Sequence, residues 1–279
     1  MVKVRKKLEA TSWNPFTGCT KISPACKNCY AEGLALKLHK WGTAGYENKF
    51  QFTVHRDRLE KAVPLKRKKP TLYFINNMSD TFHEDADEES IDQILNIVKK
   101  AHWHNFYMLT KRSERMKGYF KNKAVPDNLW IGVTVENKKD GFPRLKDLQT
   151  IETVNKHICC EPLLEDLEDI DLTGIRLVVG GGESGNKARK AELSWVESLH
   201  RQCQIQNVHF YWKQWGSYGP DGVFKGKGKT GYLVNGKALQ SFPKNLLPKN
   251  VAVQDSTRSE VPFSEIKVNH QKLFRSSRP

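Results

Sequence analysis

The chain has 279 residues, 38% of them hydrophobic, which is enough for one large core or two small ones. No apolar run is long enough to span a bilayer, and the charged amino terminus lacks an apolar signal stretch, so we expect a cytoplasmic protein without a membrane partner. The net charge of +15, from 46 Lys and Arg against 31 Asp and Glu, favours nucleic acid as a partner, although solubility alone is the plainer explanation.

In chain order, short apolar runs alternate with segments of helical periodicity. The expected strands cover 9–13, 71–75, 106–109, 129–135, 157–160, 176–179 and 208–212, and the expected helices include 30–38, 90–101 and 193–203. Strands that alternate with helices predict a parallel sheet. This number of units favours an α/β fold, a complete or partial (β/α) TIM-like barrel of mainly parallel strands. We expect the barrel to occupy residues 1–245 and a polar, basic extension to occupy 246–279.

Polar residues or glycines follow each of the six longer apolar runs. They are Asn76, Ser79 and Asp80, then Lys111 and Arg112, then Glu136 and Asn137, then Glu161, then Gly181, Gly182, Glu183 and Ser184, and finally Lys213. Because the carboxyl ends of parallel strands meet on one face of a barrel, we expect a polar rim around a shared pocket. The alternative is that loops are polar in any protein, with Asp80 capping a turn and Arg112 pairing with Glu114 or Glu136.

Three cysteines, Cys19, Cys26 and Cys29, lie close together with the spacing C-x6-C-x2-C. Thiolates are soft ligands suited to iron–sulfur clusters and to zinc. A structural zinc site normally takes four protein ligands, and His39 and His55 are poorly spaced to supply the fourth. The three thiols therefore favour a [4Fe–4S] cluster with one open iron, with zinc and unliganded thiols as the alternatives.

Several longer motifs surround these residues in order along the chain. They are WNPFTGCTKISPACKNCYAE at 13–32, NNMSDTFHED at 76–85, LTKRSERM at 109–116, WIGVTVEN at 130–137, CCEPLLEDL at 159–167, VVGGGESG at 178–185 and WKQWG at 212–216. On these motifs the chain resembles the phage-associated three-cysteine-motif family over residues of about 10 to 245. The family in turn looks like a relative of the radical S-adenosylmethionine (SAM) enzymes, although those more often show the shorter spacing C-x3-C-x2-C.

The resemblance implies a barrel that binds S-adenosylmethionine at an open iron of the cluster and receives an electron from a donor. In related barrels, the end of the second strand contacts the methionyl amine, which corresponds here to Asn76, Ser79 and Asp80. Lys111 and Arg112 would hold a carboxylate or phosphate, and Glu136 and Asn137 would bind ribose hydroxyls. Glu161, Glu183 and Ser184 would complete the cofactor site, with Gly181 and Gly182 allowing close approach of the backbone.

A second group of residues is expected to bind nucleic acid. Lys213 and Trp215 belong to an aromatic and polar block, and Lys225, Lys227 and Lys229 lie in a Gly- and Lys-rich flap over 216–236. The sequence thus predicts an iron–sulfur, radical SAM-like enzyme that modifies or repairs a nucleic acid or nucleotide, in the host cytoplasm if a phage encodes it. The alternatives are a non-catalytic phage nucleic-acid-binding protein with a structural metal or cluster, and radical modification of a protein or peptide.

Overall fold

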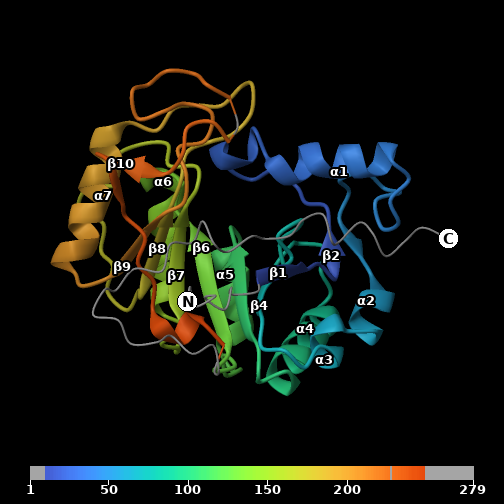
Figure 1. Cartoon of the computed structure of the whole chain (residues 1–279). Coiled ribbons are helices and arrows are strands. Elements are labelled where there is room, and N and C mark those ends of the chain that lie inside the picture. The colour runs from blue at the N-terminus through green and yellow to red at the C-terminus, as the bar shows by residue number, and fades with distance from the viewer. Residues whose placement is uncertain (1–9, 227, 249–279) are drawn as a thin grey trace, which may run out of the picture.

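The computed structural model describes residues 10–226 and 228–248, and its centre is one sheet of seven parallel strands (Figure 1). In spatial order the strands are β1 (Ala10–Trp13), β4 (Leu72–Ile75), β5 (Asn105–Thr110), β6 (Leu129–Thr134), β7 (Lys156–Cys160), β8 (Leu177–Gly180) and β9 (His209–Trp212). The seven strands expected from the sequence are thus confirmed. Because β1 and β9 are edges that do not pair with each other, the fold is a partial barrel, a half-barrel, and the complete barrel is ruled out.

Helices connect most of the strands. They are α1 (Tyr30–Lys40), α2 (Arg56–Glu60), α3 (Val63–Lys66), α4 (Glu88–Lys100), α5 (Ser113–Phe120), α6 (Lys138–Gln149) and α7 (Leu193–Ile205), with short 3-10 helices η1 (Pro24–Cys26) and η2 (Lys244–Leu246). The described segment 161–176, between β7 and β8, contains no helix. Two small antiparallel sheets lie outside the main one. The first pairs β2 (Phe16–Thr17) with the distant β3 (Thr53–Val54), and the second is a hairpin of β10 (Leu233–Val234) and β11 (Lys237–Ala238).

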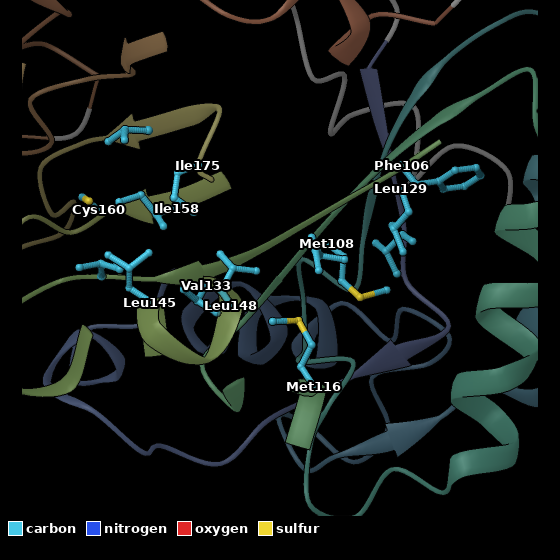
Figure 2. Close-up of a cluster of buried hydrophobic side chains, with 14 of the residues drawn as sticks. Phe106, Met108, Met116, Leu129, Val133, Leu145, Leu148, Ile158, Cys160 and Ile175 are labelled. Atoms are coloured by element: carbon cyan, nitrogen blue, oxygen red, sulfur yellow. The ribbon is translucent and has the colours of Figure 1, made fainter. Parts of the chain in front are cut away.

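The main hydrophobic core lies between the convex face of the sheet and the helices. Alternate strand residues such as Met108, Val133 and Ile158 point toward these helices and pack against Met116 of α5 and Leu148 of α6 (Figure 2). All five side chains are fully buried. Burial of this kind is the main source of stability and fixes which face of each strand points outward.

The intervening strand residues form the concave face. Tyr107 of β5 stacks on His157 of β7 with ring centroids 3.7 Å apart. Gly132 of β6 lies between them in the sheet, and a Cβ there would meet the His157 ring at 2.2 Å. Phe74 packs on the other side of Tyr107 at 5.4 Å. The concave face is therefore filled by rings at this level, which leaves its polar groups at the carboxyl ends of the strands.

Local signals explain where two of the helices begin. The Asp87 side chain accepts from the Ser90 backbone N–H at 2.7 Å at the start of α4. The Asn137 side chain accepts from the Asp140 backbone N–H at 2.7 Å at the start of α6. Both are standard N-caps. None of the helices in the described ranges is long and apolar enough to cross a membrane.

The expected extension over 246–279 lies almost wholly outside the described residues, and so does Lys227. The Gly- and Lys-rich flap is described apart from that residue and contains β10. An isolated bridge between Tyr218 and Phe224 orders its first part.

Candidate functional site

The cysteine loop lies at the carboxyl ends of the first strands, next to α1 (Figure 1). Cys19 follows β2, Cys26 ends η1, and Cys29 is the N-cap residue of α1. Gly18 makes this path possible because its φ is +77° and a Cβ would meet the Gln51 carbonyl oxygen at 2.0 Å. The loop therefore depends on a glycine immediately before its first cysteine.

The three thiols are free and half-buried, and their surroundings differ. Burial and the Asp80 carboxylate raise the pKa of Cys19 to about 11, against the opposing effect of Arg112. Burial also acts to raise the pKa of Cys26, but the Lys111 charge and hydrogen bonds from Ile22 and Ser23 outweigh it, and the pKa is lowered. Cys29 sits at the positive end of the α1 dipole.

Across residues 10–226 and 228–248, no three His, Cys, Asp or Glu side chains converge closely enough to share one metal ion. Thiolates on a single zinc ion lie within about 4 Å of one another, since each Zn–S bond is about 2.3 Å. In a [4Fe–4S] cluster each cysteine binds a different iron, so the sulfur atoms stand farther apart. In kind, the three thiols suit an iron–sulfur cluster or zinc.

Arg112 joins the cysteine loop to the loop after β4. Its guanidinium donates to Asp80 Oδ2 at 3.1 Å, to Thr20 Oγ1 at 2.7 Å and to Cys19 Sγ at 3.5 Å, and it also pairs with Glu84. Hydrogen bonds from Arg112 lower the pKa of Glu84 to about 2. The expected alternatives, pairing of Arg112 with Glu114 or Glu136, are wrong, because these four groups occupy the guanidinium.

Asp80 and Ser79 organise this corner of the site. Asp80 Oδ1 accepts from Thr110 Oγ1 at 2.6 Å and from the Phe82 N–H at 3.0 Å, so it also caps the turn. Ser79 Oγ donates to the Gly18 carbonyl at 2.6 Å. Ser79 thus contacts the cysteine loop directly and Asp80 does so through Arg112, and most of their polar atoms already have protein partners.

The loop after β8 holds the other end of the cysteine loop. Glu183 is buried and accepts from Asn28 Nδ2 at 2.9 Å and from Arg189 Nε at 3.0 Å. Arg189 Nη2 also donates to the Pro24 carbonyl at 2.9 Å. Burial acts to raise the pKa of Glu183, but the bonds from Arg189 and Asn28 outweigh it, and the pKa is lowered. We call these four residues the strap, because they connect the first and last parts of the half-barrel.

A second set of groups, the inner polar group, lies at the carboxyl ends of the middle and last strands. It comprises Tyr30, Lys111, Cys159, Glu161 and Lys213. Lys213 Nζ donates to Glu161 Oε2 at 2.9 Å, and the Glu161 charge raises the pKa of Lys213. The Lys111 and Lys213 charges both act on the Cys159 thiol, whose pKa burial raises to about 12. The Tyr30 hydroxyl donates to the Asn77 carbonyl at 2.7 Å and interacts with Lys213 and Cys29.

Several predicted ligand-binding residues have structural partners instead. Asn76 is buried, accepting from the Phe16 N–H and donating to Thr81 Oγ1. Asn137 caps α6, and Glu136 is fully buried against Arg144 at 2.7 Å. Direct contact of these three with a cofactor is therefore not supported, because their polar groups point into the protein or into a cap.

The glycine-rich stretch after β8 serves chain packing. A Cβ at Gly182 would meet the Trp215 carbonyl oxygen at 2.0 Å, and one at Gly181 would meet the Glu161 side chain at 3.1 Å. The expectation that these glycines admit a ligand is thus corrected, since protein atoms already occupy the space. Ser184 lies beside Gln214, with its Oγ 3.4 Å from Oε1.

The expected nucleic-acid residues divide into three kinds. Trp215 is only 1% exposed and donates to the Leu233 carbonyl, so its predicted role in stacking on a base is wrong. Lys213 pairs with Glu161, and Lys225 pairs with Asp221 at 2.6 Å. Lys229 is exposed.

Orphaned polar atoms at the strand ends test whether a polar ligand fits. Ser12 Oγ, Asn77 Oδ1 and Thr134 Oγ1 are buried without a hydrogen-bond partner among the described residues. Buried polar atoms are normally satisfied. A bound polar molecule would supply partners at this end of the sheet, so the residues present fit a polar cofactor in kind.

Sequence reasoning missed some of the residues that shape the site. Asn28, Tyr30 and Arg189 lie in it through contacts across 47 to 165 residues of sequence. Asn28 and Tyr30 had a local signal, since they flank the last cysteine, whereas Arg189 had none.

Comparison with known families gives one match. Residues 6–243 match a family model described as a protein of unknown function, DUF5131. No curated protein and no solved structure matches the chain.

Proposed function

The chain belongs to the DUF5131 family of proteins of unknown function, and on that premise we propose that it is an iron–sulfur enzyme of the radical SAM type. Cys19, Cys26 and Cys29 would hold a [4Fe–4S] cluster, and S-adenosylmethionine would bind beside it. The substrate is a nucleic acid or nucleotide, which the enzyme modifies or repairs. The phage association expected from the sequence remains part of this proposal.

One observation carries the proposal. Three half-buried free thiols lie on one loop at the carboxyl ends of a half-barrel, which is where α/β barrels build their active sites. The α1 amino terminus and Lys111 supply positive charge beside thiols that become anionic when they ligate metal. A loop with that charge balance suits an anionic cluster.

When bound, the cluster and cofactor would supply reductive cleavage of a carbon–sulfur bond and hydrogen-atom abstraction. The protein's own groups position the cofactor and neutralise its charged groups. Glu161, fixed by Lys213 and Gln214, offers a carboxylate for an ammonium group. Lys111 has no ion-pair partner in the described part of the chain and offers its charge to a carboxylate or phosphate.

The test is anaerobic reconstitution with iron and sulfide, followed by iron analysis and electron paramagnetic resonance with and without S-adenosylmethionine. We expect a reducible cluster whose spectrum changes when the cofactor is added, and cofactor cleavage under reductant. The C19A/C26A/C29A variant loses the cluster, whereas C203A, which removes a buried thiol from α7, retains it. Absence of iron from the reconstituted wild-type protein refutes the proposal.

The strap favours a second candidate, a non-catalytic nucleic-acid-binding protein. Asn28, Glu183 and Arg189 hold the cysteine loop to the sheet by protein contacts alone, which is what a structural loop requires. This candidate predicts tight nucleic-acid binding without any cofactor turnover, in the wild-type protein and in C19A/C26A/C29A alike.

A further inference from the structure

A group of lysines without ion pairs among the described residues lies at the opposite end of the strands from the cysteine loop. We define the basic cluster as Lys66, Lys68, Lys99 and Lys100, all exposed. Lys66 ends α3 and Lys99 and Lys100 end α4, and these elements lie at the amino ends of β4 and β5 (Figure 1). Arg67 and Lys69 lie within the same short loop, but both have interactions of their own and are not part of the basic cluster.

The chain holds this loop in a defined shape. Trp103 Nε1 donates to the Arg67 carbonyl at 2.8 Å, and His104 Nε2 lies 3.0 Å from the same oxygen. The Thr71 N–H donates to His104 Nδ1 at 3.1 Å, and Thr71 Oγ1 donates to the Lys69 carbonyl at 2.8 Å. The backbone that presents the lysines is therefore preorganised, so binding there costs little loop ordering.

Acidic residues are absent from the segments that form the basic cluster. The sequence has no Asp or Glu from 61 to 79 or from 93 to 113. Within the described ranges, none of the four lysines joins an ion pair, and Lys68 contacts only the Trp103 ring, at 5.1 Å. Four lysines nearer the candidate site differ, because Lys21, Lys190, Lys213 and Lys225 each pair with a carboxylate, although Lys111 does not.

Like charges brought together in this way repel each other, so the cluster lowers stability unless something else uses it. Lys99 and Lys100 offset the negative end of the α4 dipole, which accounts for two of the four. Lys66 and Lys68 are not explained by that effect.

We propose that the basic cluster is a second binding surface, which grips the phosphate backbone of a nucleic acid at the amino ends of the strands. Lysines bind phosphate as point charges, without reading sequence. This surface would hold a long polyanion independently of the cysteine loop, and its binding would be non-specific and sensitive to salt.

The surface chemistry favours nucleic acid over an anionic membrane. Membrane-binding surfaces combine lysines with aromatic or long apolar side chains that insert into the interface. Here the aromatic neighbour Trp103 is half-buried and its indole N–H is used within the protein. Val63, 56% exposed, is the only large exposed apolar residue in the described part of 61–104.

The test compares two variants of the full chain that lose the same charge. K66Q/K68Q/K99Q/K100Q removes the basic cluster, and K37Q/K40Q/K139Q/K146Q removes four exposed lysines from α1 and α6. Binding to labelled single- and double-stranded oligonucleotides is followed by fluorescence anisotropy over a salt series. Circular dichroism melts confirm that both variants fold.

We expect the basic-cluster variant to bind at least about tenfold more weakly at low salt, with the control variant close to wild type. If all four lysines contact phosphates of duplex DNA, the slope of log K against log salt falls in magnitude by about 3 to 4. Equal losses in both variants indicate a net-charge effect and overturn the proposal. So does wild-type binding to vesicles rich in anionic lipid without binding to oligonucleotides.

A cysteine variant separates this proposal from the proposed enzymatic function. C19A/C26A/C29A retains the binding of this surface if the two are independent, whatever the outcome of cluster reconstitution. Conversely, we expect the basic-cluster variant to have the same iron content and the same cofactor cleavage as the wild-type protein.

Discussion

Arg112 illustrates how single side chains define the candidate site. Its guanidinium meets Asp80, Glu84, Thr20 and the Cys19 thiol, and only 9% of the side chain is exposed. Such a residue is occupied by protein partners and acts chiefly by fixing the first cysteine. Lys111, its neighbour, instead keeps an ammonium group available near Cys26. The two adjacent cations thus differ in role because Arg112 has four partners within hydrogen-bond distance and the Lys111 ammonium group has no ion-pair partner among the described residues.

Asn137 offers a direct test of a corrected role. Because it caps α6, we expect Asn137→Ala to lower the free energy of unfolding by about 1 kcal/mol. Asn137→Ser retains a capping oxygen and should recover most of this loss. Chemical denaturation measures both. A variant Asn137→Ala of unchanged stability would argue that the cap contributes nothing and would reopen a ligand-binding role.

His157 predicts a pH dependence of stability. Burial lowers its pKa from 6.5 to about 3. Below pH 6.5 His157 binds a proton in the unfolded chain but stays neutral in the folded state. The free energy of unfolding therefore falls as the pH drops from 6.5 toward 3. Other histidines contribute in the same direction, so the measurement is the difference from His157→Gln. We expect a loss on the order of 1 to 3 kcal/mol between pH 7 and pH 4 that is absent in the variant. Parallel curves for the two proteins would contradict it.

At the scale of elements, the cysteine loop is fixed at both ends by segments far away in sequence. Gly18 donates its N–H to the Met78 carbonyl at 3.0 Å, and the strap holds the region around Pro24 and Asn28. The geometry of the loop is therefore set by tertiary contacts more than by local propensity.

Gly18→Ala should disrupt the start of this loop. The positive φ and the contact with the Gln51 carbonyl leave no room for a methyl group, so we expect a loss of more than about 1 kcal/mol in the free energy of unfolding. Gly33→Ala is the matched control, since no atom lies within 4 Å of a Cβ there and alanine favours the helix by up to about 1 kcal/mol. Similar melting temperatures for the two variants would show that Gly18 is not needed.

The strap gives a prediction for local stability. We expect Glu183→Ala to increase amide hydrogen exchange across residues 20–30, because Asn28 and Arg189 lose their shared partner. Glu192→Ala removes an exposed pair with Lys190 and should leave that exchange unchanged. Equal exchange in both variants would mean that the strap does not hold the loop.

The strands could be predicted from sequence because each is an apolar run ended by polar residues, as with 129–135 and β6. The candidate site could be predicted only in part. The cysteine spacing and Asp80 were visible, since both belong to local motifs. The partners of Arg112, the burial of Trp215 and the strap depend on contacts between distant segments, which one sequence does not encode locally. That β1 and β9 end the sheet without pairing with each other was equally invisible.

At the scale of the whole molecule, the two ends of the half-barrel carry different charge. The carboxyl ends hold the thiols, Lys111 and several paired lysines, and the amino ends hold the basic cluster. A chain with net charge +15 thus has, besides Lys111 at the proposed site, a separate group of lysines without ion pairs at the other end of the strands. This separation lets anchoring and chemistry be altered independently.

Cluster assembly should stabilise the entire fold if the proposed function is correct. Ligands that bind only the folded state raise its stability, so anaerobic reconstitution should raise the Tm of the wild-type protein by several degrees. The C19A/C26A/C29A variant should show no such rise. The C203A variant should show the same rise as the wild-type protein, starting from a lower Tm before reconstitution. Differential scanning calorimetry under anaerobic conditions makes the measurement. A rise shared by the triple variant would mean that iron binds elsewhere.

The strap also has a consequence for how the protein is made. Pro24 and Arg189 are 165 residues apart, so the ribosome delivers the cysteines long before the residues that clamp them. At about 5 to 20 residues per second, this interval is roughly 8 to 33 s. Throughout this interval the three thiols belong to a nascent chain that still lacks Glu183 and Arg189. During this interval the thiols therefore depend on a reducing environment, until the loop after β8 has been synthesised.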